Sequence, residues 1–206
     1  MVAKIKIAYF LEDIAHEKFL RALVARVAQQ IGLSHGDLVE NVRNATGGSR
    51  ALQELRGFLA DVKSESSSPY EILMIAKDSN CAKYSKVRND ISNIIERANY
   101  RSPVVLAIPN PYIERWYVMD LEAFKSATGA TVISKLPRKH RQRDSYKKIL
   151  RDALQTAGIT PTLGGAEYGE KVAMRIDLYK AEKVDKSFGY FVRDLKKELS
   201  KFAQNR

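Results

Sequence analysis

Short β-prone runs alternate with amphipathic helical patterns through the first half of this chain, and this alternation is the strongest constraint on its fold. The apolar runs IKIAYF, ILMIA and VVLAI have the length and composition of buried strands, and DLVENVR is a further strand candidate. The expected strands and helices follow one another at residues 5–10, 19–31, 37–43, 52–62, 72–76, 84–98 and 104–108. Strands that alternate with helices form a mostly parallel sheet covered on both faces. We therefore expect an α/β fold with right-handed crossovers.

From Pro109 onward the pattern changes, and the remaining segments all favour helices. We expect a short helix within PNPYIERWYVMD, opened by Asn110 and Pro111, and a later helix that ends at Gly158. An apolar stripe over residues 146–154 predicts this later helix, and further stripes at helical spacing predict helices over residues 168–179 and 188–202. The second half of the chain is therefore expected to add helices and no further strands.

The length and composition suit one large domain or a domain with an appended lobe. The chain has 206 residues, 45% of them apolar and 29% charged, so it should bury a substantial core. We expect an α/β core over residues 1–110 and a helical lobe over residues 111–206, packed together as one compact unit. Since neither a membrane-spanning stretch nor a cleavable apolar leader stands out, we expect a soluble, cytoplasmic protein.

Cysteine and histidine are too scarce for several kinds of site. Cys81 is the single cysteine, which excludes a disulfide within the chain and a cysteine-clustered zinc site. The histidines, His16, His35 and His140, are scattered, which argues against a histidine-rich metal site. The glycine-rich run at 47–49 lacks the lysine of a P-loop, so a nucleoside triphosphatase is not expected.

The net charge of +11 makes nucleic acid the leading candidate partner, because such an excess attracts polyanions. The segment KLPRKHRQR gathers five cations that are suited to phosphate contacts: Lys135, Arg138, Lys139, Arg141 and Arg143. A solvated loop is the alternative interpretation of this segment.

Polar residues follow two of the expected strands at the point where each ends. Glu12 and Asp13 follow the first strand, and Asp78, Ser79 and Asn80 follow the third. Because the carboxyl ends of parallel strands meet at one edge of a sheet, neighbouring strands would bring Glu12 and Asp78 to one ion. Oxygen donors of this kind suit Mg²⁺. In the alternative interpretation, Asp13 caps the first helix and Ser79 or Asn80 caps the third.

These motifs resemble a known family. The glutamate in FLEDIAHEKF and the strand that ends in KDSN are similar to the TOPRIM domain of topoisomerases, primases and small nucleases. The later stretches AIPNPYIERWYVMD, GGAEY and SFGYFVRDL resemble a bacterial group of TOPRIM-like proteins, the DUF4276-like family. The resemblance implies a Rossmann-like (TOPRIM-like) sheet flanked by helices, with a C-terminal helical lobe.

The resemblance also assigns roles to individual residues. It implies that Glu12 is a general acid or base that also touches metal, and that Asp78 is a Mg²⁺ ligand. Asn80 stands where a second acid is expected, and its amide oxygen can coordinate the metal ion but brings no negative charge. This departure implies weaker ion binding, reliance on substrate phosphates for charge, or a site that has lost catalysis. Glu17 corresponds to a second glutamate, which either faces the site or supports the helix dipole.

Other residues near the same edge are candidates on position alone. Lys77 either holds a phosphate or extends from the strand end into solvent. Glu114, beside Arg115, either completes the catalytic site or lies on an exposed helix face, with Ile113 and Trp116 packing inward. Arg115 is a candidate contact for nucleic acid.

The expected function is hydrolysis of phosphodiester bonds in DNA or RNA, with Mg²⁺ or Mn²⁺ as cofactor. The resemblance implies a role in antiviral defence, with an ATPase protein as a partner. The alternative is a catalytically silent TOPRIM-like subunit that binds nucleic acid or docks onto a partner protein. The choice between DNA and RNA stays open.

Overall fold

The computed structural model describes residues 4–48, 50–64, 70–131 and 145–204, and it has an α/β fold. Its four strands form one sheet, β1 (Ile5–Leu11), β2 (Leu38–Asn44), β3 (Ile72–Ala76) and β4 (Val104–Ala107). All neighbouring pairs are parallel, in the order β2-β1-β3-β4. The parallel sheet flanked by helices confirms the expected fold class.

Nine α-helices and two short 3₁₀ turns, η1 (His35–Asp37) and η2 (Ala166–Tyr168), lie in the described ranges. The α-helices are α1 (Ile14–Gln30), α2 (Ala51–Ser64), α3 (Tyr84–Arg97), α4 (Ile113–Val118), α5 (Leu121–Thr128), α6 (Ser145–Thr156), α7 (Gly169–Ala173), α8 (Leu178–Val184) and α9 (Lys186–Ala203). None of these described helices is long and apolar enough to cross a membrane.

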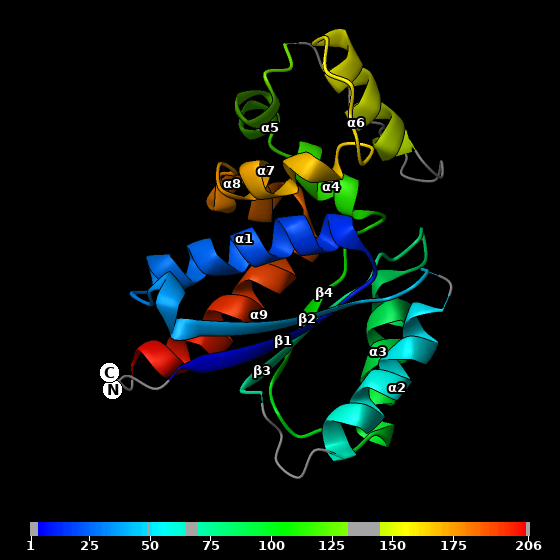
Figure 1. The fold of residues 1–206 in the computed structure, drawn as a ribbon, viewed down its shortest axis with the longest axis vertical. Helices are drawn as coiled ribbons and strands as arrows, with labels where there is room; N and C mark the ends of the chain where they lie inside the picture. Colours follow the sequence, from blue (N-terminus) through cyan, green and yellow to red (C-terminus); the bar gives the residue numbers. More distant parts are fainter. Residues whose placement is uncertain (1–3, 49, 65–69, 132–144, 205–206) are drawn as a thin grey trace.

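Helices cover both faces of the sheet, with α2 and α3 on one side and α1 and α9 on the other (Figure 1). Side chains alternate along a strand, so β1 contributes to two cores. Ala8 and Phe10 pack with α2 and α3, whereas Ile7, Tyr9 and Leu11 pack with α1 and α9. A strand buried on both faces reads as a nearly continuous apolar run, as the sequence IKIAYF does.

The helices after residue 110 pack on the sheet layer through a group of aromatic rings. The Trp116 ring lies 5.2 Å from Phe188 and 5.6 Å from Phe191 of α9, measured between ring centroids. Phe19 of α1 stacks on Tyr117 of α4 at 5.3 Å. Helix α9 also packs against β4, while α5 and α6 lie beyond α4, away from the sheet (Figure 1).

The expected helix over 168–179 is wrong, because the chain there forms η2, α7 and α8. The break comes from a tertiary contact: Asp120 Oδ2 accepts a hydrogen bond from the backbone N of Asp177 at 2.8 Å. The Asp177 side chain in turn accepts from Lys180 N and starts α8. Tyr179, expected to be in the apolar stripe, is 70% exposed.

Of two predicted helix boundaries, the start of α4 is wrong and the end of α6 is confirmed. Helix α4 begins at Ile113, with Tyr112 at its N-cap, so Asn110 and Pro111 do not open it. Asn110 instead precedes a cis proline peptide bond, and its Oδ1 accepts a hydrogen bond from Ser79 Oγ. Gly158, with φ of +74°, follows the end of α6 as predicted.

Candidate functional site

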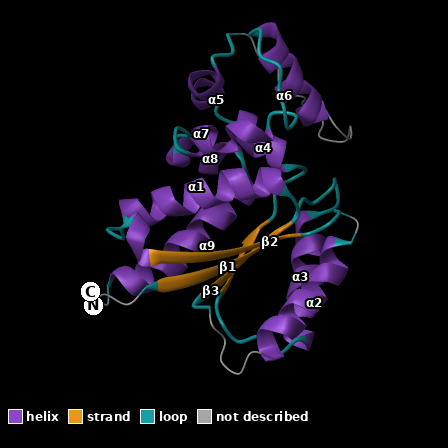
Figure 2. Cartoon of the chain, viewed as in Figure 1, coloured by secondary structure: helices purple, strands orange, loops and turns teal. Residues whose placement is uncertain are grey.

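Glu12 and Asp78 meet at the carboxyl edge of the sheet, because β1 and β3 are neighbours in register from Ile7 to Leu11. The loops that follow the strands gather at this edge, beside the start of α1 (Figure 2). Glu12 Oε2 accepts a hydrogen bond from the backbone N of Asp78 at 2.6 Å. The predicted convergence of the two carboxylates is therefore confirmed.

His16, in the first turn of α1, is the third member of this group. One ligand atom from each of Glu12, His16 and Asp78 lies within 4.8 Å of the others, and all three residues are buried. Two carboxylates and an imidazole at this separation can hold a metal ion. The sequence pattern does not single out His16, because the three histidines are scattered along the chain, although His16 lies only four residues after Glu12 and three after Asp13, the candidate cap of the first helix.

Asp13 fixes the orientation of His16. Its Oδ1 caps α1 by accepting from the backbone N of Ala15 and His16, at 3.0 and 3.1 Å. The same oxygen lies 2.8 Å from His16 Nδ1, while His16 Nε2 lies 3.1 Å from Asp78 Oδ1. The predicted capping role of Asp13 is confirmed, and it comes with a second role as the partner of the histidine.

The carboxylates around His16 alter its acid–base behaviour. Burial disfavours the charged imidazolium, but the charge of Asp78 and the hydrogen bonds to Asp13 and Asp78 outweigh it and raise the pKa of His16 well above its usual value. Burial tends to raise the pKa of Asp13, but the bonds from His16 lower it to about 2. An imidazolium held between two carboxylates would have to lose the proton of its ligating nitrogen before that nitrogen could bind a metal ion.

Glu12 is enclosed by Lys77 and by the loop after β2. Burial, and then the nearby charge of Asp78, raises the pKa of Glu12. Lys77 Nζ lies 3.3 Å from Glu12 Oε1 and donates to the carbonyl of Gly48 at 3.2 Å. A Cβ at Gly48 would lie 2.4 Å from Glu12 Oε1, so a larger residue at this position would require the Glu12 carboxylate to shift.

These groups line an open cleft of about 800 Å³. Its described walls include Glu12, Asp13, Gly48, Lys77, Asp78, Asn80 and Lys147. Lys77 therefore lies on the cleft side of its strand, as the phosphate-binding interpretation requires, although it is paired with Glu12 in this structure. Lys147 comes from α6 and was not a candidate in the sequence.

Glu114 is buried beneath the start of α6, and the exposed helix face considered for it is wrong. Its Oε1 lies 3.7 Å from Lys147 Nζ, and its Oε2 has no hydrogen-bond partner among the described residues. Burial, and then the charge of Asp78, raises the pKa of Glu114 to about 7. Ile113 and Trp116 are buried in the core, as expected.

Asn80 stands apart from the group of three ligands. It is exposed, in a left-handed backbone conformation with φ of 51°, and its Nδ2 lies 3.4 Å from the carbonyl of Asp78. Neither Asn80 nor Ser79 caps α3, because Lys83 holds the N-cap position without a side-chain bond. The capping prediction for these two residues is therefore wrong.

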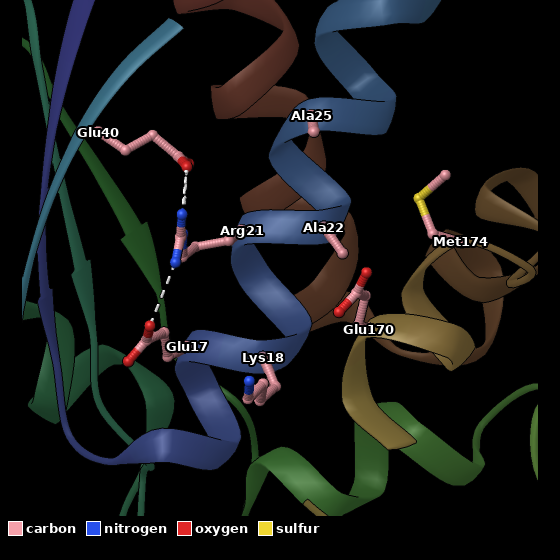
Figure 3. A pocket seen from close by; sticks show the side chains of 8 residues that line it. All are labelled: Glu17, Lys18, Arg21, Ala22, Ala25, Glu40, Glu170 and Met174. Carbon is pink, nitrogen blue, oxygen red and sulfur yellow. Dashed lines mark hydrogen bonds and ion pairs between the residues drawn. The ribbon is translucent and has the colours of Figure 1, made fainter. Parts of the chain in front are cut away.

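Glu17 lies on a different cleft, of about 310 Å³, between α1, β2 and α7. Figure 3 shows Arg21 between Glu17 and Glu40, with nitrogen–oxygen distances of 3.3 and 2.8 Å. Glu17 also accepts from Asn44 Nδ2 at 2.6 Å. The structure thus places Glu17 in a network of side chains along α1 and β2, and outside the group of Glu12, His16 and Asp78.

The remaining candidates lie in the helical part of the chain. Arg115 forms an ion pair with Asp185 and donates to the Tyr146 hydroxyl at 2.8 Å, and 14% of its side chain is exposed. Its guanidinium is thus engaged within the fold. The basic segment of Lys135, Arg138, Lys139, Arg141 and Arg143 lies outside the described residues.

Comparisons of the chain with protein-family models, with curated proteins and with solved structures give no match.

Proposed function

We propose that this protein is a divalent-metal-dependent nuclease that hydrolyses phosphodiester bonds. The observation that carries the proposal is the convergence of Glu12, His16 and Asp78 beside an open cleft, whose wall Glu12 and Asp78 form in part. Lysines from two parts of the chain, Lys77 and Lys147, line the same cleft. A cleft that combines acidic metal ligands with cations, in a chain of net charge +11, suits a polyanionic substrate.

The donor set fits a divalent ion. Two carboxylates supply hard oxygen ligands, and the imidazole extends the fit from Mg²⁺ to Mn²⁺ and other transition metals. Asp13 behind His16 gives the carboxylate–histidine arrangement that commonly supports a metal-bound imidazole. We therefore propose Mg²⁺ or Mn²⁺ as the cofactor, held by Glu12, His16 and Asp78.

An ion bound there would polarise a phosphoryl oxygen and neutralise charge as it develops. The residues of the chain would supply the other requirements. Lys77 and Lys147 would hold the phosphodiester in the cleft by charge. Glu114, with a pKa of about 7, would be suited to exchange a proton near neutral pH.

Nuclease assays on plasmid, single-stranded DNA and structured RNA, with Mg²⁺ and with Mn²⁺, test the proposal. Glu12→Gln and Asp78→Asn should lower the cleavage rate at least about a hundredfold, because each removes a ligand charge. Asp90→Asn, on the exposed face of α3 beside Lys86, is the matched control and should cleave as wild type does. Cleavage that is unchanged in Glu12→Gln and Asp78→Asn would contradict the proposal.

A catalytically silent subunit is the second candidate, and two observations favour it. Lys77 already neutralises Glu12, and Asn80 brings no negative charge to the ion. Such a subunit would bind nucleic acid or dock onto a partner such as an ATPase. It predicts wild-type protein that binds nucleic acid with no cleavage in either metal.

A further inference from the structure

We propose that a second cavity, next to the cleft, is a subsite for one unpaired nucleotide that flanks the bond to be cut. The cavity has a volume of about 300 Å³ and lies between the start of α1, α4, α6 and the turn before η2. Apolar side chains and cations are combined in its described lining, which includes Ile14, Leu150, Leu163, Lys147 and Arg151. The inference rests on the proposed function, since it takes nucleic acid as the ligand of the cleft.

The cavity adjoins the cleft because two residues line both. Asp13 and Lys147 belong to the described walls of each. Asp13 Oδ1 lies 2.8 Å from His16 Nδ1. The boundary between the cleft and the second cavity is therefore only one side chain away from the candidate metal ligands. A strand whose phosphate lies near Glu12 and Asp78 would therefore pass directly into the second cavity.

The apolar wall of the cavity suits a nucleobase. Ile14 and Leu163, which line the same cavity, are 39% and 52% exposed. A base packed on them would remove this surface from water. The cavity volume is at the lower limit of small-molecule sites, which is enough for one nucleotide and too small for the two nucleotides of a base pair. The expected substrate is thus single-stranded at this position.

The polar groups of the cavity suit both the sugar-phosphate backbone and the base edge of a nucleotide. Lys147 and Arg151 lie one turn apart on α6, each with 55% of its side chain exposed, so both can reach a sugar-phosphate backbone. Glu114 forms part of the wall, with nine-tenths of its side chain buried and Oε2 lacking a hydrogen-bond partner among the described residues. A base that carries N–H donors offers the kind of partner that this acceptor lacks.

Fluorescence anisotropy with the full chain tests the subsite. The probes are a short labelled single strand and its blunt duplex, as DNA and as RNA, with Ca²⁺ as the divalent ion. Leu163→Ser should weaken single-strand binding about tenfold, the scale of one apolar side chain that is no longer removed from water. Val184→Ser, at a position equally exposed at 53% but outside the described lining, should change it less than about twofold.

A second pair of variants examines the cations. Lys147→Met should weaken single-strand binding and reduce its salt dependence, whereas Lys148→Met, one residue along the same helix, should do so less. Because Leu163, Val184, Lys147 and Lys148 are exposed, none of the variants should unfold the chain, and a thermal melt checks this.

The outcomes separate the subsite from the nuclease. Equal single-strand affinity of Leu163→Ser and Val184→Ser, or tighter binding of the blunt duplex, overturns the subsite, even if the wild type cleaves. If the wild type cleaves no probe in Mg²⁺ or Mn²⁺ while Leu163→Ser still weakens binding, the nuclease proposal fails and the subsite stands.

Discussion

At the scale of single residues, His16 sets the character of the candidate site. It is fully buried between Asp13 and Asp78, and its two ring nitrogens contact one carboxylate each. A protonated imidazole held this way would stabilise both negative charges in the metal-free protein. Metal binding would replace a proton of the imidazole, so His16 and Asp78 would serve a structural role without the ion and a ligand role with it.

Glu114 gives a prediction for pH dependence. Its pKa rises from 4.5 to about 7 on folding, so the unfolded chain ionises first as pH increases. This residue should therefore lower the free energy of unfolding as pH rises from 4.5 to 7, by about 3 kcal/mol in all, with no further change above that range. Urea denaturation across this range should show Glu114→Gln gaining that amount over wild type.

Glu122→Gln is the matched control for this measurement, because its side chain is 87% exposed. Its free energy of unfolding should follow the wild-type pH profile within about 0.5 kcal/mol. A profile for Glu114→Gln that also runs parallel to wild type would show that burial does not raise the pKa of Glu114.

At the scale of elements, the loop between β2 and α2 shapes the metal site through Gly48. A methyl group there would lie 2.4 Å from Glu12 Oε1 and force the carboxylate to move. Gly48→Ala should therefore weaken Mn²⁺ binding about tenfold, in line with the loss of a group that positions a metal ligand. Isothermal titration calorimetry measures the change.

Gly47→Ala is the control within the same loop, since a Cβ at Gly47 meets no heavy atom within 4 Å. It should bind Mn²⁺ as wild type does. Equal losses in the two variants would mean that the flexibility of the loop, and not the contact with Glu12, governs the affinity.

The elements also explain how much of the fold and site the sequence predicts. Local patterns suffice for β1 and β3, whose apolar runs are buried on both faces, and for the meeting of Glu12 and Asp78 at their ends. They fail between 168 and 179, because the bond from Asp177 N to Asp120 joins residues far apart in sequence. They also miss Lys147, which reaches the cleft only through the packing of α6.

At the scale of the whole molecule, the excess of 35 basic over 24 acidic residues should govern encounter with nucleic acid. Replacing Arg138, Lys139, Arg141 and Arg143 by serine should weaken binding to all sequences alike. If all four contact phosphates of a single strand, the slope of log affinity against log salt should flatten by about 3. Anisotropy titrations at several salt concentrations test this, and an unchanged slope would identify the segment as solvated surface.

Anomalous diffraction from crystals soaked in Mn²⁺ shows whether Glu12, His16 and Asp78 together bind one divalent ion. We expect one Mn²⁺ peak within coordination distance of Glu12, His16 Nε2 and Asp78, and we expect Asp78→Asn to lose it. A Mn²⁺ peak only at other residues would contradict metal binding by these three side chains. So would a crystal that shows no Mn²⁺ peak and keeps the ion pair between His16 and Asp78 unchanged.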